Sequence, residues 1–70
     1  FNEDFIDTVQ NEKLAKALRR LTDRQKQAIK LAFWEGYQYK EIAAVFQCSP
    51  AAVTLLLQRA FHRLSEYLNE

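Results

Sequence analysis

Turn-forming residues are scarce in this chain, and their scarcity constrains the fold more than any other feature. The 70 residues contain one glycine, Gly36, and one proline, Pro50, so the tight turns of β-hairpins have almost no residues to form them. With 49% hydrophobic and 27% charged residues, the composition is that of a packed globular protein. A length of 70 residues allows one domain. We therefore predict a single all-α domain.

The first helix is expected over Glu3–Arg20, where apolar residues form an imperfect stripe. The polar residues at positions 10–12 interrupt that stripe, and Asn11 is a reasonable N-cap. The segment therefore forms either one helix or two pieces that meet near Asn11.

The second helix has clear signals at both ends. Thr22, with Gln25 three residues later, has the form of a capping box. Gly36 can adopt the left-handed conformation that ends a helix after Glu35. Between these signals lies a wide apolar arc that should face the core, formed by Ala28, Ile29, Leu31, Ala32 and Phe33.

Two further helices should follow with a very short connection. A helix over Tyr39–Phe46 has its apolar residues on one side, and Ser49 and Pro50 form an N-cap and N1 pair that starts a fourth helix. In the fourth helix the apolar residues recur at three- and four-residue spacing: Val53, Leu56, Leu57, Ala60, Leu64 and Leu68. This pattern predicts a four-helix domain with a C-terminal helix-turn-helix and no winged elements. The second helix of such a pair can enter the major groove of DNA.

The charges are segregated along the chain although they nearly cancel overall, at a net charge of +1. Residues 1–12 carry four acidic and no basic residues, residues 13–30 carry seven basic residues and one acidic, and residues 31–70 carry three basic and four acidic residues. The basic middle segment is either a solvated helix face or part of a nucleic-acid interface.

Several functions are disfavoured by what the sequence lacks. One cysteine, Cys48, and one histidine, His62, cannot form a disulfide or a tetrahedral zinc site, so we expect no metal, no cofactor and a cytoplasmic location. No apolar run approaches the length of a membrane span, and the first residues lack the basic start of a signal peptide. The convergent residues of a catalytic cleft are also missing, so no catalytic residue and no enzyme activity are expected.

Three motifs in order resemble region 4 of bacterial sigma factors of the sigma-70 family. They are L-T-D-R-Q-K-Q-A-I-K-L at 21–31, E-G-Y-Q-Y-K-E-I-A at 35–43 and R-A-F-H-R-L at 59–64. The likeness is greatest to the extracytoplasmic-function (ECF) type. The resemblance implies a module that reads the minus-35 promoter element, docks on the β flap of RNA polymerase core and is a possible target of an anti-sigma factor. Residues 1–20 would be the linker and first helix, residues 21–68 the core of the module, and the chain the C-terminal fragment of a longer protein.

The fourth helix carries the candidate DNA-contacting residues on the side away from its apolar stripe. The base contacts are predicted at Ser49, Ala51, Ala52, Thr54, Leu55, Gln58 and His62, and the phosphate contacts at Arg24, Lys26, Lys40 and Arg59. Gln58 can make a bidentate contact to adenine, and small apolar groups can touch a thymine methyl. For Arg59 a surface salt bridge, and for His62 a solvated position, are the alternatives.

Two features depart from the family pattern. Members usually carry Lys or Arg around positions 54–56, where this chain has Thr-Leu-Leu, so DNA affinity should be reduced. Gln47 replaces the common turn glycine, so either it tolerates a strained backbone or the turn is of another type. Trp34 either packs on the first helix, which we favour, or is an exposed contact for a partner, and Cys48 should be a small, buried apolar residue.

Two other functions compete with the sigma interpretation. The output domain of response-regulator transcription factors shares the L-T-x-R-Q and K-E-I-A patterns, but Tyr39 and the R-A-x-x-x-L ending favour the sigma family. A sigma-like module that has lost DNA binding and contacts only proteins is favoured by the lack of cations in the recognition helix.

Overall fold

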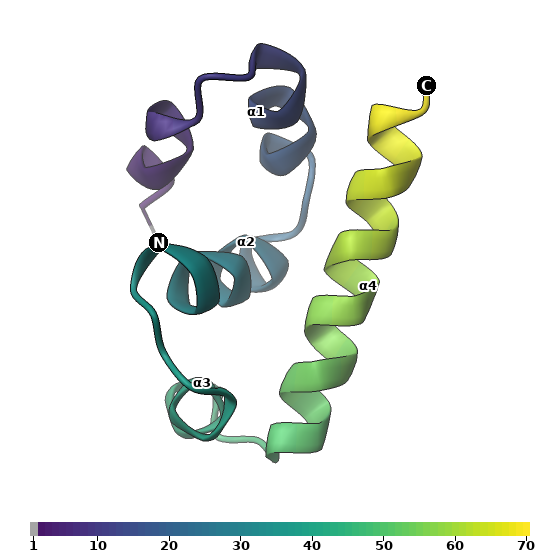
Figure 1. The fold of residues 1–70 in the computed structure, drawn as a ribbon. Coiled ribbons are helices and arrows are strands. Elements are labelled where there is room, and N and C mark those ends of the chain that lie inside the picture. Colours follow the sequence, from purple (N-terminus) through teal and green to yellow (C-terminus); the bar gives the residue numbers. More distant parts are fainter. Residues whose placement is uncertain (1) are drawn as a thin grey trace.

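The computed structural model describes residues 2–70. They form six helical elements: η1 (Asp4–Thr8, a 3-10 turn), α1 (Glu12–Arg19), α2 (Asp23–Ile29), η2 (Lys30–Trp34, a π-helical turn), α3 (Tyr39–Phe46) and α4 (Pro50–Leu68). No strand occurs within residues 2–70, which confirms the all-α prediction. Figure 1 shows α4 along one side of the molecule, with α1, α2 and α3 on the other.

The N-terminal segment is two pieces, so the continuous helix over Glu3–Arg20 was wrong and the alternative break near Asn11 is confirmed. The side-chain Oδ1 of Asn11 accepts a hydrogen bond from the backbone N–H of Leu14 at 3.1 Å. This bond satisfies a helix donor that has no intrahelical partner. The cap therefore starts α1 at Glu12 and leaves η1 as a separate turn.

The capping box predicted at Thr22 is present. The Gln25 N–H donates to the Thr22 hydroxyl, and the Thr22 N–H donates to the Gln25 side chain, both at 3.1 Å. After Ile29 the helix widens into η2, where the Glu35 N–H donates to the Lys30 carbonyl at 3.0 Å. Such i→i+5 turns are rare and leave no signal in helix propensity. Gly36 follows with φ +71°, as expected for the residue that ends this helix.

The turn between α3 and α4 forms the predicted helix-turn-helix, and the chain bends there by 95°. Gln47 lies in the left-handed region at φ 56° and ψ 48°, and the Cys48 N–H donates to the Ala43 carbonyl at 2.9 Å. The strained alternative for Gln47 is therefore the one that occurs. Cys48 is half-buried and packs at the edge of the core.

The core lies between α4 and the other three helices, since α4 contacts α1, α2 and α3. Its least exposed large side chains are Ile6, Ile42, Val53 and Leu57. The predicted stripe of α4 faces this core, with Val53, Leu57, Ala60 and Leu64 buried and Leu56 and Leu68 half-buried. The buried stripe fixes which side of α4 faces outward.

Within residues 2–70 no single helix has the length and hydropathy needed to cross a membrane; α3 and α4 meet that test only as a pair bent by 95°.

Candidate nucleic-acid interface

The start of α4 is fixed by its cap. The Ser49 Oγ accepts a hydrogen bond from the Ala52 N–H at 3.1 Å, and Pro50 occupies the first helical position, where a backbone donor is not needed. The buried stripe, beginning at Val53, holds the opposite side of the first three turns toward solvent. This arrangement presents one side of α4, next to the sharp turn after α3, to a partner.

The seven predicted base-contact residues are all exposed: Ser49, Ala51, Ala52, Thr54, Leu55, Gln58 and His62. Thr54 and Leu55 come three and four residues after Ala51, Gln58 comes four and three residues after them, and His62 comes four residues after Gln58. This spacing places the five residues along one side of the helix. Ser49 is engaged in the cap, and Ala52 lies toward the flank of this side. The structure therefore brings five of the seven together as one surface, which we call the α4 outer face.

The α4 outer face is uncharged from Pro50 to Gln58, because no Lys, Arg, Asp or Glu occurs there. The Thr54 hydroxyl donates to the Pro50 carbonyl at 3.2 Å, so its donor capacity is used within the helix. Leu55 is 45% exposed and contributes only apolar surface. Such a face suits thymine methyl groups, with Gln58 available for adenine, and lacks the Arg or Lys that most often reads guanine.

Three of the predicted phosphate contacts are exposed cations near this end of the molecule. Arg24 begins α2 and has its guanidinium 4.8 Å from the ring centroid of Phe46, at the end of α3. Lys40 lies in the first turn of α3, and Arg59 lies on α4 directly after Gln58. Within residues 2–70 none of the three forms an ion pair, so the salt-bridge alternative for Arg59 is not observed. Their charges remain available to an anionic partner.

Lys26, the fourth predicted phosphate contact, lies elsewhere. Its side chain is 6% exposed, and its ammonium group pairs with Glu3 and, at 3.4 Å, with Asp23. The hydrogen bond to Glu3 raises the pKa of Lys26 above its usual 10.5, with burial acting against it and Asp23 adding to it. A charge buried and neutralised in this way is not available to DNA, so Lys26 is removed from the candidate interface.

Trp34 packs on η1, inside the segment predicted as the first helix, and is still 40% exposed. Its ring meets Phe5 edge to face with centroids 4.9 Å apart, and its Nε1–H donates to the Thr8 hydroxyl at 2.9 Å. His62 is solvated on α4, with its Nε2 3.9 Å from a carboxylate oxygen of Glu66.

An exposed aromatic pair was missed by sequence reasoning. Phe33 was assigned to the apolar arc of its helix but is 61% exposed, and its ring meets that of Phe61 edge to face at 5.6 Å. The π-helical turn η2 changes the direction in which residues 30–34 project, so α-helical spacing gives the wrong side for Phe33.

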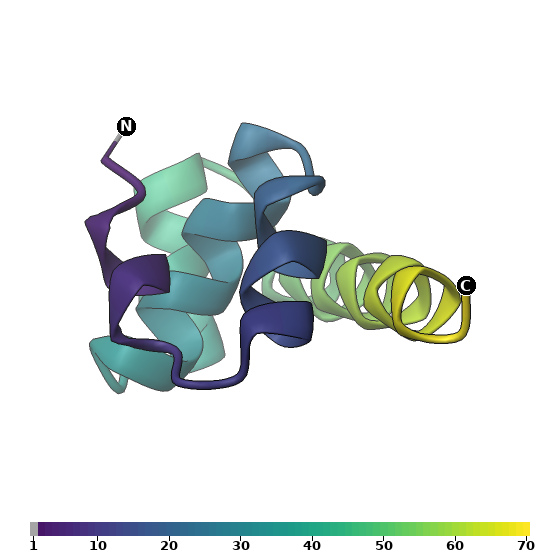
Figure 2. The ribbon, with the colours of Figure 1, turned by 90° about the horizontal axis from the view of Figure 1, so that it is seen from above.

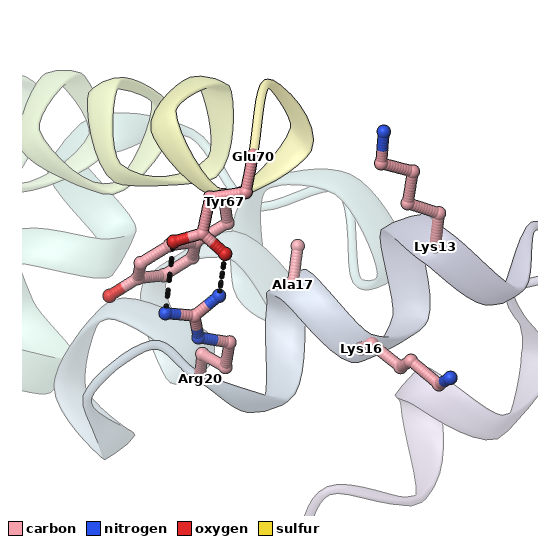
Figure 3. Close-up of a pocket in the computed structure, with 6 residues that line it drawn as sticks. All are labelled: Lys13, Lys16, Ala17, Arg20, Tyr67 and Glu70. Carbon is pink, nitrogen blue, oxygen red and sulfur yellow. Dashed lines mark hydrogen bonds and ion pairs between the residues drawn. The ribbon is translucent and has the colours of Figure 1, made fainter.

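A shallow groove lies between α1 and the C-terminal end of α4 (Figure 3), far along α4 from its first turns. It is lined by Lys13, Lys16, Ala17, Arg20, Tyr67 and Glu70. The Arg20 guanidinium donates two hydrogen bonds to the Glu70 carboxylate, at 2.6 and 3.2 Å, and lies 3.9 Å from the centroid of the Tyr67 ring. Hydrogen bonding to Arg20 lowers the pKa of Glu70 below its usual 4.5. This pair neutralises Arg20, one of the three cations that line the groove.

No cluster of metal-binding side chains occurs within residues 2–70. Comparison with curated proteins and with solved structures gave no significant match. The family model for sigma-70, region 4, matches residues 11–64. The match spans α1 to the fourth turn of α4 and includes the whole helix-turn-helix. The chain therefore belongs to the sigma-70 region 4 family, the non-enzymatic DNA-binding module of sigma factors.

Proposed function

We propose that this chain is region 4 of an ECF-type sigma factor and that α4 reads the minus-35 promoter element from the major groove. The observation that carries the proposal is the α4 outer face: an uncharged, exposed surface of five residues beside three cations that form no ion pair within residues 2–70. The face lies on a single helix, and the major groove of DNA is wide enough to admit one α-helix. Arg24, Lys40 and Arg59 would contact phosphates on either side.

This division of charge gives the two parts of the interface different roles. Phosphate contacts release counterions and position the protein without reading sequence, whereas the α4 outer face can only read bases. With few cations, the chain alone binds DNA weakly. Promoter selectivity then depends on docking to the β flap of RNA polymerase, which we propose as the second partner.

The test is binding of a minus-35 duplex, followed by fluorescence anisotropy over a range of salt concentrations. Arg59→Ala should weaken binding to all sequences and reduce the slope of log affinity against log salt by about 1. Lys13→Ala removes an exposed cation from the far end of the molecule and should change neither quantity. If both variants behave alike, Arg59 does not contact phosphate.

A protein-only module is the second candidate, and the exposure of Leu55 favours it. Leu55→Lys separates the two functions. In the major groove the new ammonium group gains a phosphate within reach, so general DNA affinity rises. If DNA binding stays unchanged while capture of core polymerase or an anti-sigma protein is lost, the α4 outer face docks on protein. The match to sigma-70 region 4 favours both candidates over the response-regulator alternative.

A further inference from the structure

The turn η1 precedes the part of the chain that matches the family, residues 11–64, yet it is built into the core. Ile6 is 0% exposed and Phe5 is 7% exposed. The rest of the domain therefore presents an apolar surface that the matched region does not itself cover. In this chain η1 covers it.

Three side chains from three elements hold η1 in place. Arg19 of α1 pairs with Asp7 at 3.0 Å, Lys26 of α2 pairs with Glu3, and Trp34 of η2 contacts Phe5 and Thr8. We call the surface formed by Arg19, Lys26 and Trp34 the η1 site. Arg19 and Lys26 are the two cations of this site, Trp34 is its aromatic residue, and Phe5 and Ile6 of η1 are buried there.

The attachment of η1 to this surface is made by side chains alone. Its backbone hydrogen bonds are internal, from the Ile6 N–H to the Glu3 carbonyl at 2.9 Å and from the Val9 N–H to the Ile6 carbonyl at 3.0 Å. Within residues 2–70 no backbone hydrogen bond joins residues 2–9 to the rest of the chain. An occupant of the η1 site is thus recognised by its side-chain pattern: an acid, then an aromatic and an aliphatic residue together, then a second acid.

We propose that the η1 site is a docking site for an acidic, amphipathic helical segment of a partner protein, and that η1 occupies it in cis as a competitor. Charge complementarity identifies the occupant, since Arg19 and Lys26 both pair with carboxylates of the N-terminal segment and Trp34 packs on an aromatic ring there. Lys26 also keeps its pair with Asp23 of α2. The proposal does not depend on DNA binding. Figures 1 and 2 both show η1 on the opposite side of the molecule from α4, so a segment docked there leaves the α4 outer face free.

The test uses the full chain and a labelled peptide with the sequence of residues 2–10. Glu3→Gln combined with Asp7→Asn removes the two ion pairs of η1 and keeps its apolar residues. The matched control is Asp4→Asn, because Asp4 is an exposed acid in the same turn that forms no ion pair within residues 2–70. Trp34 is the single tryptophan, so its fluorescence reports the site, and circular dichroism reports the fold.

The double variant should bind the peptide about tenfold or more tightly than the parent chain, because a tethered competitor acts at an effective concentration of roughly millimolar and has been weakened. The parent and Asp4→Asn should bind alike, and a peptide with lysines at the two acidic positions should not bind to any of the three chains.

Three results would overturn the proposal. A folded double variant that binds no peptide shows that the η1 site takes no acidic segment. Loss of helical signal in the double variant shows that η1 is required for the fold and cannot be exchanged. Dimerisation of the variant, measured by light scattering, shows that the occupant is η1 of a second copy.

Discussion

Replacing Gln47 by glycine should stabilise the domain, although the substitution removes a side chain at the turn of the helix-turn-helix. Gln47 has φ 56°, and the left-handed region costs a non-glycine residue roughly 1–2 kcal/mol. Its side chain is exposed and makes no hydrogen bond within residues 2–70, so no contact is lost. Glycine makes the unfolded chain more flexible, which offsets about 0.4–1 kcal/mol. At the middle of these two ranges the net gain is about 0.8 kcal/mol in the free energy of unfolding.

A gain of this size corresponds to a rise in Tm of about 2–8 °C for a domain of this length. Gly36→Ala is the matched control, because Gly36 has φ +71° and an added Cβ would meet no atom within 4 Å. It should lower Tm by a similar amount, because backbone strain outweighs the reduced flexibility of the unfolded chain, and the two changes together should nearly cancel. Thermal unfolding by circular dichroism measures all three variants. A lowered or unchanged Tm for Gln47→Gly, with Gly36→Ala behaving as expected, would refute the reasoning.

Other substitutions test the core, the groove and the interface. Leu57→Ala, at a side chain that is 1% exposed, should lower the free energy of unfolding by about 2–5 kcal/mol in urea denaturation, and an unchanged midpoint would contradict its place in the core. Glu70→Gln should lower Tm near neutral pH. The pair with Arg20 stabilises the fold only while Glu70 is ionised, so the difference in Tm between variant and parent should vanish as the pH falls below 4.5 through the lowered pKa of Glu70. A difference in Tm that persists at about pH 2 would exclude the pair as its cause. Gln58→Ala should change the preferred base at one position of the minus-35 element, by about 1–3 kcal/mol, and should leave the salt slope intact; an equal loss on every DNA sequence would argue against base contact.

Much of the fold from Thr22 onward could be predicted because its signals are local. The helix over Tyr39–Phe46, the start of α4 at Pro50 and the capping box at Thr22 all occur where the sequence placed them. Each of these features depends on residues within four positions of one another, such as the caps and Pro50. The end of the second helix at Gly36 is a local signal of the same kind. The buried stripe of α4 follows from its period, so the exposure of the predicted base contacts could also be predicted.

The features that sequence reasoning missed depend on distant partners or on unusual backbone. Lys26 is buried because Glu3, 23 residues away, pairs with it, and no periodic pattern reports such a pair. The same basic segment contains the exposed Lys13 and Lys16, so charge alone could not distinguish the buried Lys26 from the exposed lysines. The π-helical turn after Ile29 has no sequence signature, and it exposes Phe33. Contact of the exposed residues with DNA stays a prediction.

The pair between Arg20 and Glu70 also bears on the kinetics of folding, since the two residues are 50 positions apart. Contact between the end of α1 and the end of α4 closes a long loop of chain. The chain loses conformational entropy when this loop closes, before the pair adds any stability, so the contact forms late. The turns that link α2, α3 and α4 are much shorter and close early. Contacts that form after the rate-limiting step slow unfolding but do not speed folding. The pair of Arg20 and Glu70, although half-exposed, should therefore slow unfolding more than it speeds folding.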